Sequence, residues 1–206
     1  MKKLGFALLV LILLAGCSSE PAKKTQEEKP KPKQAELLTG RAGFYKTLPS
    51  ARGWKADAQL YRVMSQPNAD SKGREGKSAI WKVWYASPAS RAAKPYVWSG
   101  TDAPDAPSRG VSPGTEDTYS PTNSSTQVFD MAFLKIDTDK AFEVAQQHGG
   151  DKVLEKNPDV NLVYLVDWNK NENELVWHVY YGNSRDDAKL RIAVNATTGE
   201  FLRKEK

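Results

Sequence analysis

The chain has 206 residues, enough for one domain of ordinary size or two small ones that share an interface. Its formal charge of +5 comes from lysines and arginines that are spread along the chain and mixed with acidic residues, which argues against a nucleic-acid-binding patch. The single cysteine excludes an internal disulfide and a structural zinc site of the multi-cysteine kind.

The first 17 residues have the pattern of an export signal. Two lysines precede an apolar run, residues 4–14, that is too short to span a bilayer as a stable helix. The run ends in Leu14-Ala15-Gly16-Cys17, which resembles the bacterial lipobox. In lipoprotein signals of that kind, cleavage falls before the cysteine and its thiol receives a diacylglyceryl group.

The lipobox resemblance implies that residues 1–16 are a lipoprotein signal peptide and that Cys17 carries the lipid, palmitate included. An ordinary signal peptide with a chance cysteine is the alternative, but the protein's only cysteine stands where the lipobox needs it. Several acyl chains would hold the protein on a membrane without a spanning helix. Ser18, in place of the aspartate that retains some lipoproteins on the inner membrane, favours the periplasmic face of an outer membrane where the cell has one.

Residues 17–36 are mostly Lys, Glu, Pro, Gln and Ser, a composition that predicts a disordered tether between the membrane and the folded part. A first unit, residues 37–100, then opens with a helix that Thr39 should cap and Pro49 should end. A strand over 58–65, a polar loop over 66–77 and a β-hairpin over 79–100 should follow it.

A connection rich in Pro, Gly, Ser and Thr, residues 101–126, is expected to be irregular. The second unit, residues 127–206, should begin with an extended segment over 127–134 and a helix over 138–148. Gly149 and Gly150 should end that helix. A short turn over 151–157, a strand over 161–168 and a hairpin with a tail over 175–202 complete the predicted order.

The two hairpins are similar in sequence. Residues 79–100 align with residues 175–196 without a gap, which places Trp81 on Trp177 and Tyr85 on Tyr181. Both units also share the order helix, broken turn, strand, loop and hairpin. The sequence therefore predicts an α+β fold of two tandem units, each a helix packed on a small antiparallel β-sheet.

The second unit resembles the PepSY family. The resemblance rests on the helix start from Asp137 to Ala141, on the Gly149-Gly150 helix end and on a last strand running into Val194-Asn195-Ala196-Thr197-Thr198-Gly199-Glu200. That family usually carries Asp where this chain has Asn195, and the first unit has lost the turn. The resemblance implies a small extracytoplasmic binding or inhibitory module, often beside peptidases, without catalytic residues. The tandem layout is also similar to that of the beta-lactamase inhibitor protein family, without a sequence match.

No catalytic or metal-binding motif stands out in the sequence. Neither a nucleophile elbow, a His-Glu-x-x-His motif nor a phosphate-binding loop is present. His148 should serve as a helix-end residue. The acidic pairs lie at a helix start or a turn, where Asp has a local backbone role: Asp137, Asp139, Asp186 and Asp187. We therefore expect no enzyme, no cofactor and no metal.

Strand parity divides the aromatic side chains of the hairpins into two faces. Trp81, Tyr85, Trp177 and Tyr181 should face the helices together with Val83 and Val179. The opposite face should carry the candidate partner-binding residues, which are Lys82, Trp84, His178 and Tyr180. If that face is exposed, truncating Trp84 or Tyr180 should cost little stability; the alternative is that the partner unit or the 101–126 connection covers it.

These observations lead to one functional hypothesis and two alternatives. The first is a lipid-anchored, extracytoplasmic, non-enzymatic binding or inhibitory module that acts on a cell-envelope protein such as a peptidase. The second is a structural or assembly lipoprotein with no separable ligand. The third and weakest is a hydrolase whose active site the motifs do not reveal.

Overall fold

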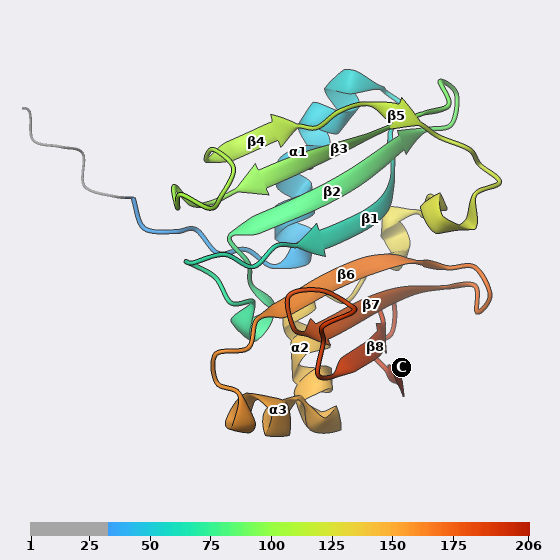
Figure 1. Cartoon of the computed structure of the whole chain (residues 1–206). Helices are drawn as coiled ribbons and strands as arrows, with labels where there is room; N and C mark the ends of the chain where they lie inside the picture. Colours follow the sequence, from blue (N-terminus) through green and yellow to red (C-terminus); the bar gives the residue numbers. More distant parts are fainter. Residues whose placement is uncertain (1–32) are drawn as a thin grey trace, which may run out of the picture. The chain divides into compact units, whose positions relative to one another are not determined.

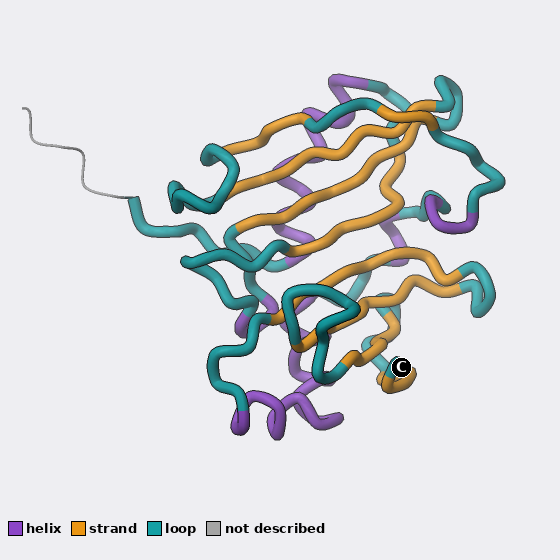
Figure 2. Tube along the Cα trace, viewed as in Figure 1, coloured by secondary structure: helices purple, strands orange, loops and turns teal. Residues whose placement is uncertain are grey.

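The computed structural model describes residues 33–206, and the nine strands of this part form one antiparallel sheet with the order β4-β3-β2-β1-β6-β7-β8-β9 and β5 beside β3 (Figures 1 and 2). The predicted signal peptide, Cys17 and most of the tether lie outside the described residues. The strands are β1 (Gln59–Ser65), β2 (Ile80–Ser87), β3 (Ala92–Ser99), β4 (Gly110–Pro113), β5 (Asp117–Thr118), β6 (Leu162–Asn169), β7 (Glu174–Tyr181), β8 (Arg191–Asn195) and β9 (Phe201–Lys204).

The longer helices pack on one face of this sheet, α1 (Gly40–Trp54) on β1, β2 and β3 and α2 (Thr138–Ala145) on β7 and β8 (Figure 1). A single hydrophobic core lies between them and includes Phe44, Trp81, Trp177 and Val179. The predicted α+β class with helices on an antiparallel sheet is confirmed. The two predicted units do not each build a sheet of their own, because β1 pairs with β6 and the sheet runs through both.

The two repeated tryptophans occupy equivalent places in the core, as strand parity predicted. Trp81 and Trp177 are both fully buried. The indole Nε1 of Trp81 donates to the carbonyl of Leu38, and that of Trp177 donates to the carbonyl of Ile136, each at 2.9 Å. Both carbonyls come just before a helix, so each tryptophan ties a strand to the start of the helix that covers it.

The N-termini of α1 and α2 meet in space, which changes how α1 is capped. The side chain of Thr39 makes no capping hydrogen bond, contrary to the prediction. Instead the amide of Gly40 donates to Thr138 Oγ1 and the amide of Arg41 donates to Asp137 Oδ1, both at 2.9 Å. The second segment therefore satisfies the free amides of the first segment's helix.

The predicted helix end at Pro49 is wrong, whereas the predicted end at Gly149 coincides with a break in the helix. Pro49 lies inside α1, which continues to Trp54. Proline has no amide hydrogen, so the carbonyl of Tyr45, a residue that is 52% exposed, loses its helical donor without ending the helix. The second helix passes at residues 146–150 into a wide turn, where Gly149 has φ +110°, and resumes as α3 (Asp151–Lys156), so the predicted turn over 151–157 is largely helical.

The connection over 101–126 is more regular than predicted, since it contributes β4 and β5 beside β3 and a 3-10 turn, η2 (Ser124–Thr126). Residues 127–134 are not an extended strand: they make one bridge, Phe129 to Leu60, and a 3-10 turn, η3 (Met131–Phe133).

A last strand, β9, was not predicted and pairs with β8 beyond the turn at Gly199. The φ of Gly199, +82°, agrees with the predicted need for glycine in that turn.

Two short segments complete the described fold: η1 (Arg74–Gly76) in the polar loop before β2, and the wide turn η4 (Gln146–Gly150). Within residues 33–206, every helix is too short or too polar to cross a bilayer.

Candidate functional site: a pocket on the helix-free face of the sheet

Over β1, β2 and β3, one end of the sheet face opposite the helices is covered. Tyr119, from the 101–126 connection, is buried against Tyr61, Ala86 and Ala93, and Trp84 packs beside this cluster. The amide of Tyr119 also donates to the carbonyl of the turn between β2 and β3, at 2.8 Å. The 101–126 connection therefore covers the part of this face around Tyr61, Ala86 and Ala93, while Lys82 and Trp84 stay partly exposed, so the alternative that the sequence left open holds for part of the face.

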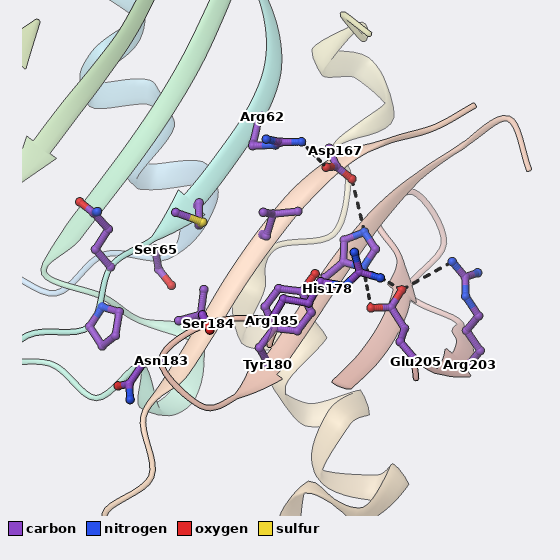
Figure 3. A pocket seen from close by; sticks show the side chains of 15 residues that line it. Arg62, Ser65, Asp167, His178, Tyr180, Asn183, Ser184, Arg185, Arg203 and Glu205 are labelled. Carbon is purple, nitrogen blue, oxygen red and sulfur yellow. Dashed lines mark hydrogen bonds and ion pairs between the residues drawn. The ribbon is translucent and has the colours of Figure 1, made fainter. Parts of the chain in front are cut away.

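Over β1, β6 and β7, the same face is hollowed into a pocket of about 780 Å³ (Figure 3). Its floor is apolar and consists of Met64, Val163, Leu165 and Tyr180. One wall is the end of β1 and the chain that follows it, residues 65–67, and the other is the loop between β7 and β8, residues 183–185. The volume and the mixed lining are typical of small-ligand and peptide sites.

The carboxylate of Asp187 fixes the conformation of the loop between β7 and β8 through hydrogen bonds. Its Oδ1 accepts hydrogen bonds from the amide and hydroxyl of Ser184, at 2.6 and 2.8 Å, and its Oδ2 accepts from the amide of Asn183 at 3.1 Å. Hydrogen bonds from Ser184, and then from Asn183, lower the pKa of Asp187 to about 2. The predicted backbone role of this aspartate is confirmed, and its effect is to position Arg185 at the pocket.

A chain of alternating charges runs along one side of the pocket. Arg62 Nη2 lies 3.0 Å from Asp167 Oδ2, and Asp167 Oδ1 lies 3.3 Å from His178 Nε2. On the other side of the imidazole ring, His178 Nδ1 lies 2.9 Å from Glu205 Oε1, which is 3.6 Å from Arg203 Nη2 (Figure 3). The chain therefore ties β1, β6, β7 and the C-terminal strand together through side chains that are each at least partly buried.

The central histidine of this chain is protonated at neutral pH. Burial alone would lower the pKa of His178, but its hydrogen bonds to Asp167 and Glu205 outweigh that effect and raise the pKa to about 9. Burial also opposes the ionisation of both carboxylates, yet the contact with His178 keeps the pKa of each below its ordinary value. The three groups thus stabilise one another as a carboxylate, imidazolium, carboxylate set.

The predicted partner-binding residues fall into two places. His178 and Tyr180 line the pocket, whereas Lys82 and Trp84 lie outside it, with Lys82 Nζ 4.8 Å from the centre of the Trp84 ring. Tyr180 is only 5% exposed, so at this residue the covered alternative holds and not the exposed one. The sheet packs it under the β7–β8 loop, and the side chain of His178 is buried in the ion-pair chain.

Sequence reasoning did not find Arg62, Asp167, Arg203 or Glu205. Asp167 carried a usable signal, because it alternates with Val163 and Leu165 and so shares their face of a predicted strand. Glu205 carried none, since the strand that brings it to His178 was not predicted. Arg62 follows a β-bulge in β1 that breaks the alternation between Leu60 and Arg62.

Other candidate groups have structural contacts. His148 Nδ1 lies 2.8 Å from the carbonyl of Val144, and its ring stacks on Phe201 with centroids 3.8 Å apart. Asp137 accepts a hydrogen bond from the amide of Thr138 at the start of α2, as predicted. In the described part of the chain, no group of three or more His, Cys, Asp and Glu side chains is placed to bind a metal.

Comparison with known proteins gives a fold relationship. No protein-family model matches the sequence, PepSY included, and a search of curated proteins also finds no match. Among solved structures, the fold is similar to that of "a putative lipoprotein (CD1622) from Clostridium difficile 630", with a TM-score of 0.51 and 10% identity over 79% of this chain and 91% of that one. At this identity the likeness concerns the fold.

Proposed function

We propose that this protein is a lipid-anchored extracytoplasmic module that binds another protein of the cell envelope and catalyses no reaction. The anchor is supported by Leu14-Ala15-Gly16-Cys17, in which the only cysteine takes the lipobox position. A fold neighbour described as a lipoprotein supports the same location. The periplasmic face of an outer membrane is the proposed site where the cell has such a membrane.

The proposal includes the origin of the fold: residues 37–100 and 127–206 are diverged copies of one PepSY-like unit. Equivalent hydrogen bonds at the ends of the two hairpins support this. The amide of Gly100 donates to the carbonyl of Ala79, and the amide of Ala196 donates to the carbonyl of Leu175, each at 2.8 Å. The matching indole bonds of the two buried tryptophans support it further.

The observation that carries the binding role is the open pocket over β1, β6 and β7, while part of the helix-free face over β1–β3 is covered by Tyr119. Ligand sites combine an apolar lining with a few placed polar groups, as this pocket does. A catalytic role for His178 is disfavoured because both ring nitrogens contact carboxylates, which leaves neither free to accept a proton from a substrate.

Affinity capture from solubilised membranes tests the binding role. We compare the tagged full-length protein with Arg185→Glu, which reverses an exposed charge at the pocket, and with Arg91→Glu, which reverses an exposed charge in the turn between β2 and β3. One stoichiometric envelope partner, retained by the wild type and Arg91→Glu and lost from Arg185→Glu, is the expected result.

Two outcomes would overturn parts of the proposal. If no variant captures a partner at stoichiometric yield, the protein is the structural or assembly lipoprotein of the alternative hypothesis. The anchor is tested separately: Cys17→Ala should abolish the lipid mass shift and leave an uncleaved or soluble product. A Cys17→Ala protein that fractionates like the wild type with the same mass shift would exclude the lipobox.

A further inference from the structure

The pocket carries more positive than negative charge. Arg62, His178, Arg185 and Arg203 contribute four cations to its lining, while Asp167 and Glu205 contribute two anions. The high pKa of the imidazole supports counting it as charged at neutral pH. An anionic ligand therefore complements this pocket, and an additional cation does not.

The cations are not equally available to a ligand. The guanidinium group of Arg62 forms an ion pair with Asp167, and that of Arg203 forms ion pairs with Glu172 and Glu205. Within residues 33–206, no carboxylate lies within ion-pair distance of Arg185, although its side chain lies near enough to Tyr180 and Glu205 to act on both electrostatically. Figure 3 shows Arg185, from the β7–β8 loop, beside His178 and Tyr180 in the pocket lining.

The lining also indicates what should surround the ligand's charge. Met64, Val163 and Leu165 form an aliphatic floor that suits a hydrophobic side chain. A guanidinium group binds a carboxylate through two parallel hydrogen bonds, which a single exposed arginine can offer at low desolvation cost. β1 and β6 pair with each other over residues 62–64 of β1, and beyond that stretch the amides of Tyr164 and Leu162 donate to Ser65 and Lys72. A peptide is therefore expected to lie across the sheet face and not to add as a strand.

We propose that this pocket binds an acidic and apolar peptide segment of the envelope partner, with Arg185 receiving a carboxylate and the floor of Met64, Val163 and Leu165 receiving the neighbouring apolar side chain. This inference rests on the proposed binding role and names the chemistry that the partner presents. The ion-pair chain serves as a positioning element that holds β9 and the pocket floor together.

A matched pair of capped peptides isolates the carboxylate. Acetyl-Leu-Glu-Leu-amide and acetyl-Leu-Gln-Leu-amide have nearly the same shape and differ in charge. We titrate each into full-length protein in detergent at pH 7 and measure affinity from amide chemical shifts. The glutamate peptide should bind about tenfold more tightly at low salt, and this preference should shrink as salt screens the charges.

Two substitutions assign that preference to its residue. Arg185→Gln should bring the two affinities within about threefold of each other, while Arg91→Gln, which removes an exposed guanidinium elsewhere, should leave the preference intact. Equal affinities in the wild type, no binding of either peptide at millimolar concentration, or a preference that survives Arg185→Gln would each overturn the inference.

The failure of this inference and that of the proposed function have different signatures. If the partner is still captured but the wild type shows no preference for the glutamate peptide, the binding role stands and the acidic ligand is wrong. If the preference depends on Arg185 but membranes yield no partner, the pocket chemistry stands and the envelope-protein role is wrong.

Discussion

The two halves of the sheet are alike on the helix side and different on the other. Trp81 and Trp177 make the same indole hydrogen bond and are equally buried. On the opposite face, the half over β2 and β3 is partly covered by Tyr119, whereas the half over β6 and β7 forms a pocket lined by an ion-pair chain. The repeated strand pattern thus places equivalent side chains in the core on the helix side. Segments outside the repeat determine whether the opposite face is covered or forms a pocket.

The largest expected effects concern the two equivalent tryptophans, Trp81 and Trp177, in the shared core. Trp81→Ala and Trp177→Ala should each cost about 3–5 kcal/mol of unfolding free energy, because both remove a fully buried indole from a packed site. Since both lie in one core, each variant should still unfold in a single transition by circular dichroism and fluorescence. Separate transitions for the two halves would show that they are independent units.

A pH titration of stability would sharpen the difference between the two halves of the helix-free face. The folded pKa of His178, about 9, is raised above the ordinary value of 6.5, so its contribution is fully present below pH 6.5 and is lost as the pH rises towards 9. The shift corresponds to about 3 kcal/mol. His178→Gln should lose this alkaline dependence, whereas His148→Gln should keep it; equal profiles for wild type and His178→Gln would contradict the ion-pair chain.

The carboxylates change stability with pH in the opposite direction, because their contribution is lost as the pH falls. The folded pKa values of Asp167 and Glu205 are lowered, so their contribution is present above the unfolded carboxyl pKa of about 4 and is lost as the pH falls below it. In Asp167→Asn, acid denaturation followed by circular dichroism should depend less steeply on pH than in the wild type. An unchanged acid profile would indicate that these carboxylates do not stabilise the fold.

Truncations on the helix-free face should also differ between the halves. Tyr180→Ala should cost about 2–3 kcal/mol because the side chain is nearly fully buried, whereas Trp84→Ala should cost about 1 kcal/mol because that side chain is only partly buried. Thermal and denaturant midpoints measure both. If Tyr180→Ala is as mild as Trp84→Ala, the β7–β8 loop does not cover Tyr180 in solution.

The smallest effect concerns the last turn, where this chain has Asn and the PepSY pattern has Asp. Asn195 Nδ2 donates to Glu174 Oε2 at 2.8 Å, while its Oδ1 accepts from the amides of Thr197 and Thr198. Asn195→Asp should cost about 1 kcal/mol, since it replaces a hydrogen-bond donor with a second carboxylate beside Glu174.

The background of Glu174→Gln supplies the control for this substitution. There the added aspartate no longer faces a carboxylate, so the cost of Asn195→Asp should largely disappear when unfolding free energies are compared as a double-mutant cycle. An equal cost in both backgrounds would mean that the amide serves the turn and not Glu174.

The candidate site could be predicted only in part. Alternation placed His178 and Tyr180 on the face away from the helices and could have added Asp167, because period-2 alternation is a local property of an extended backbone. The burial of His178 and Tyr180 could not be predicted from alternation. Tyr180 lies under a loop that Asp187 folds over it, and His178 meets a carboxylate 27 residues further along the chain.

By itself, the sequence determined the α+β class, the two buried hairpin faces and the glycine requirement at Gly199, because these depend on alternation, helical spacing and local backbone sterics. Only the tertiary structure decided that β1 pairs with β6 to make one sheet, that Thr138 and Asp137 cap α1, and that Arg62, Asp167, His178 and Glu205 meet at a pocket. These contacts join residues that are far apart along the chain, and their free energy depends on burial and on partners that no local pattern of residues contains.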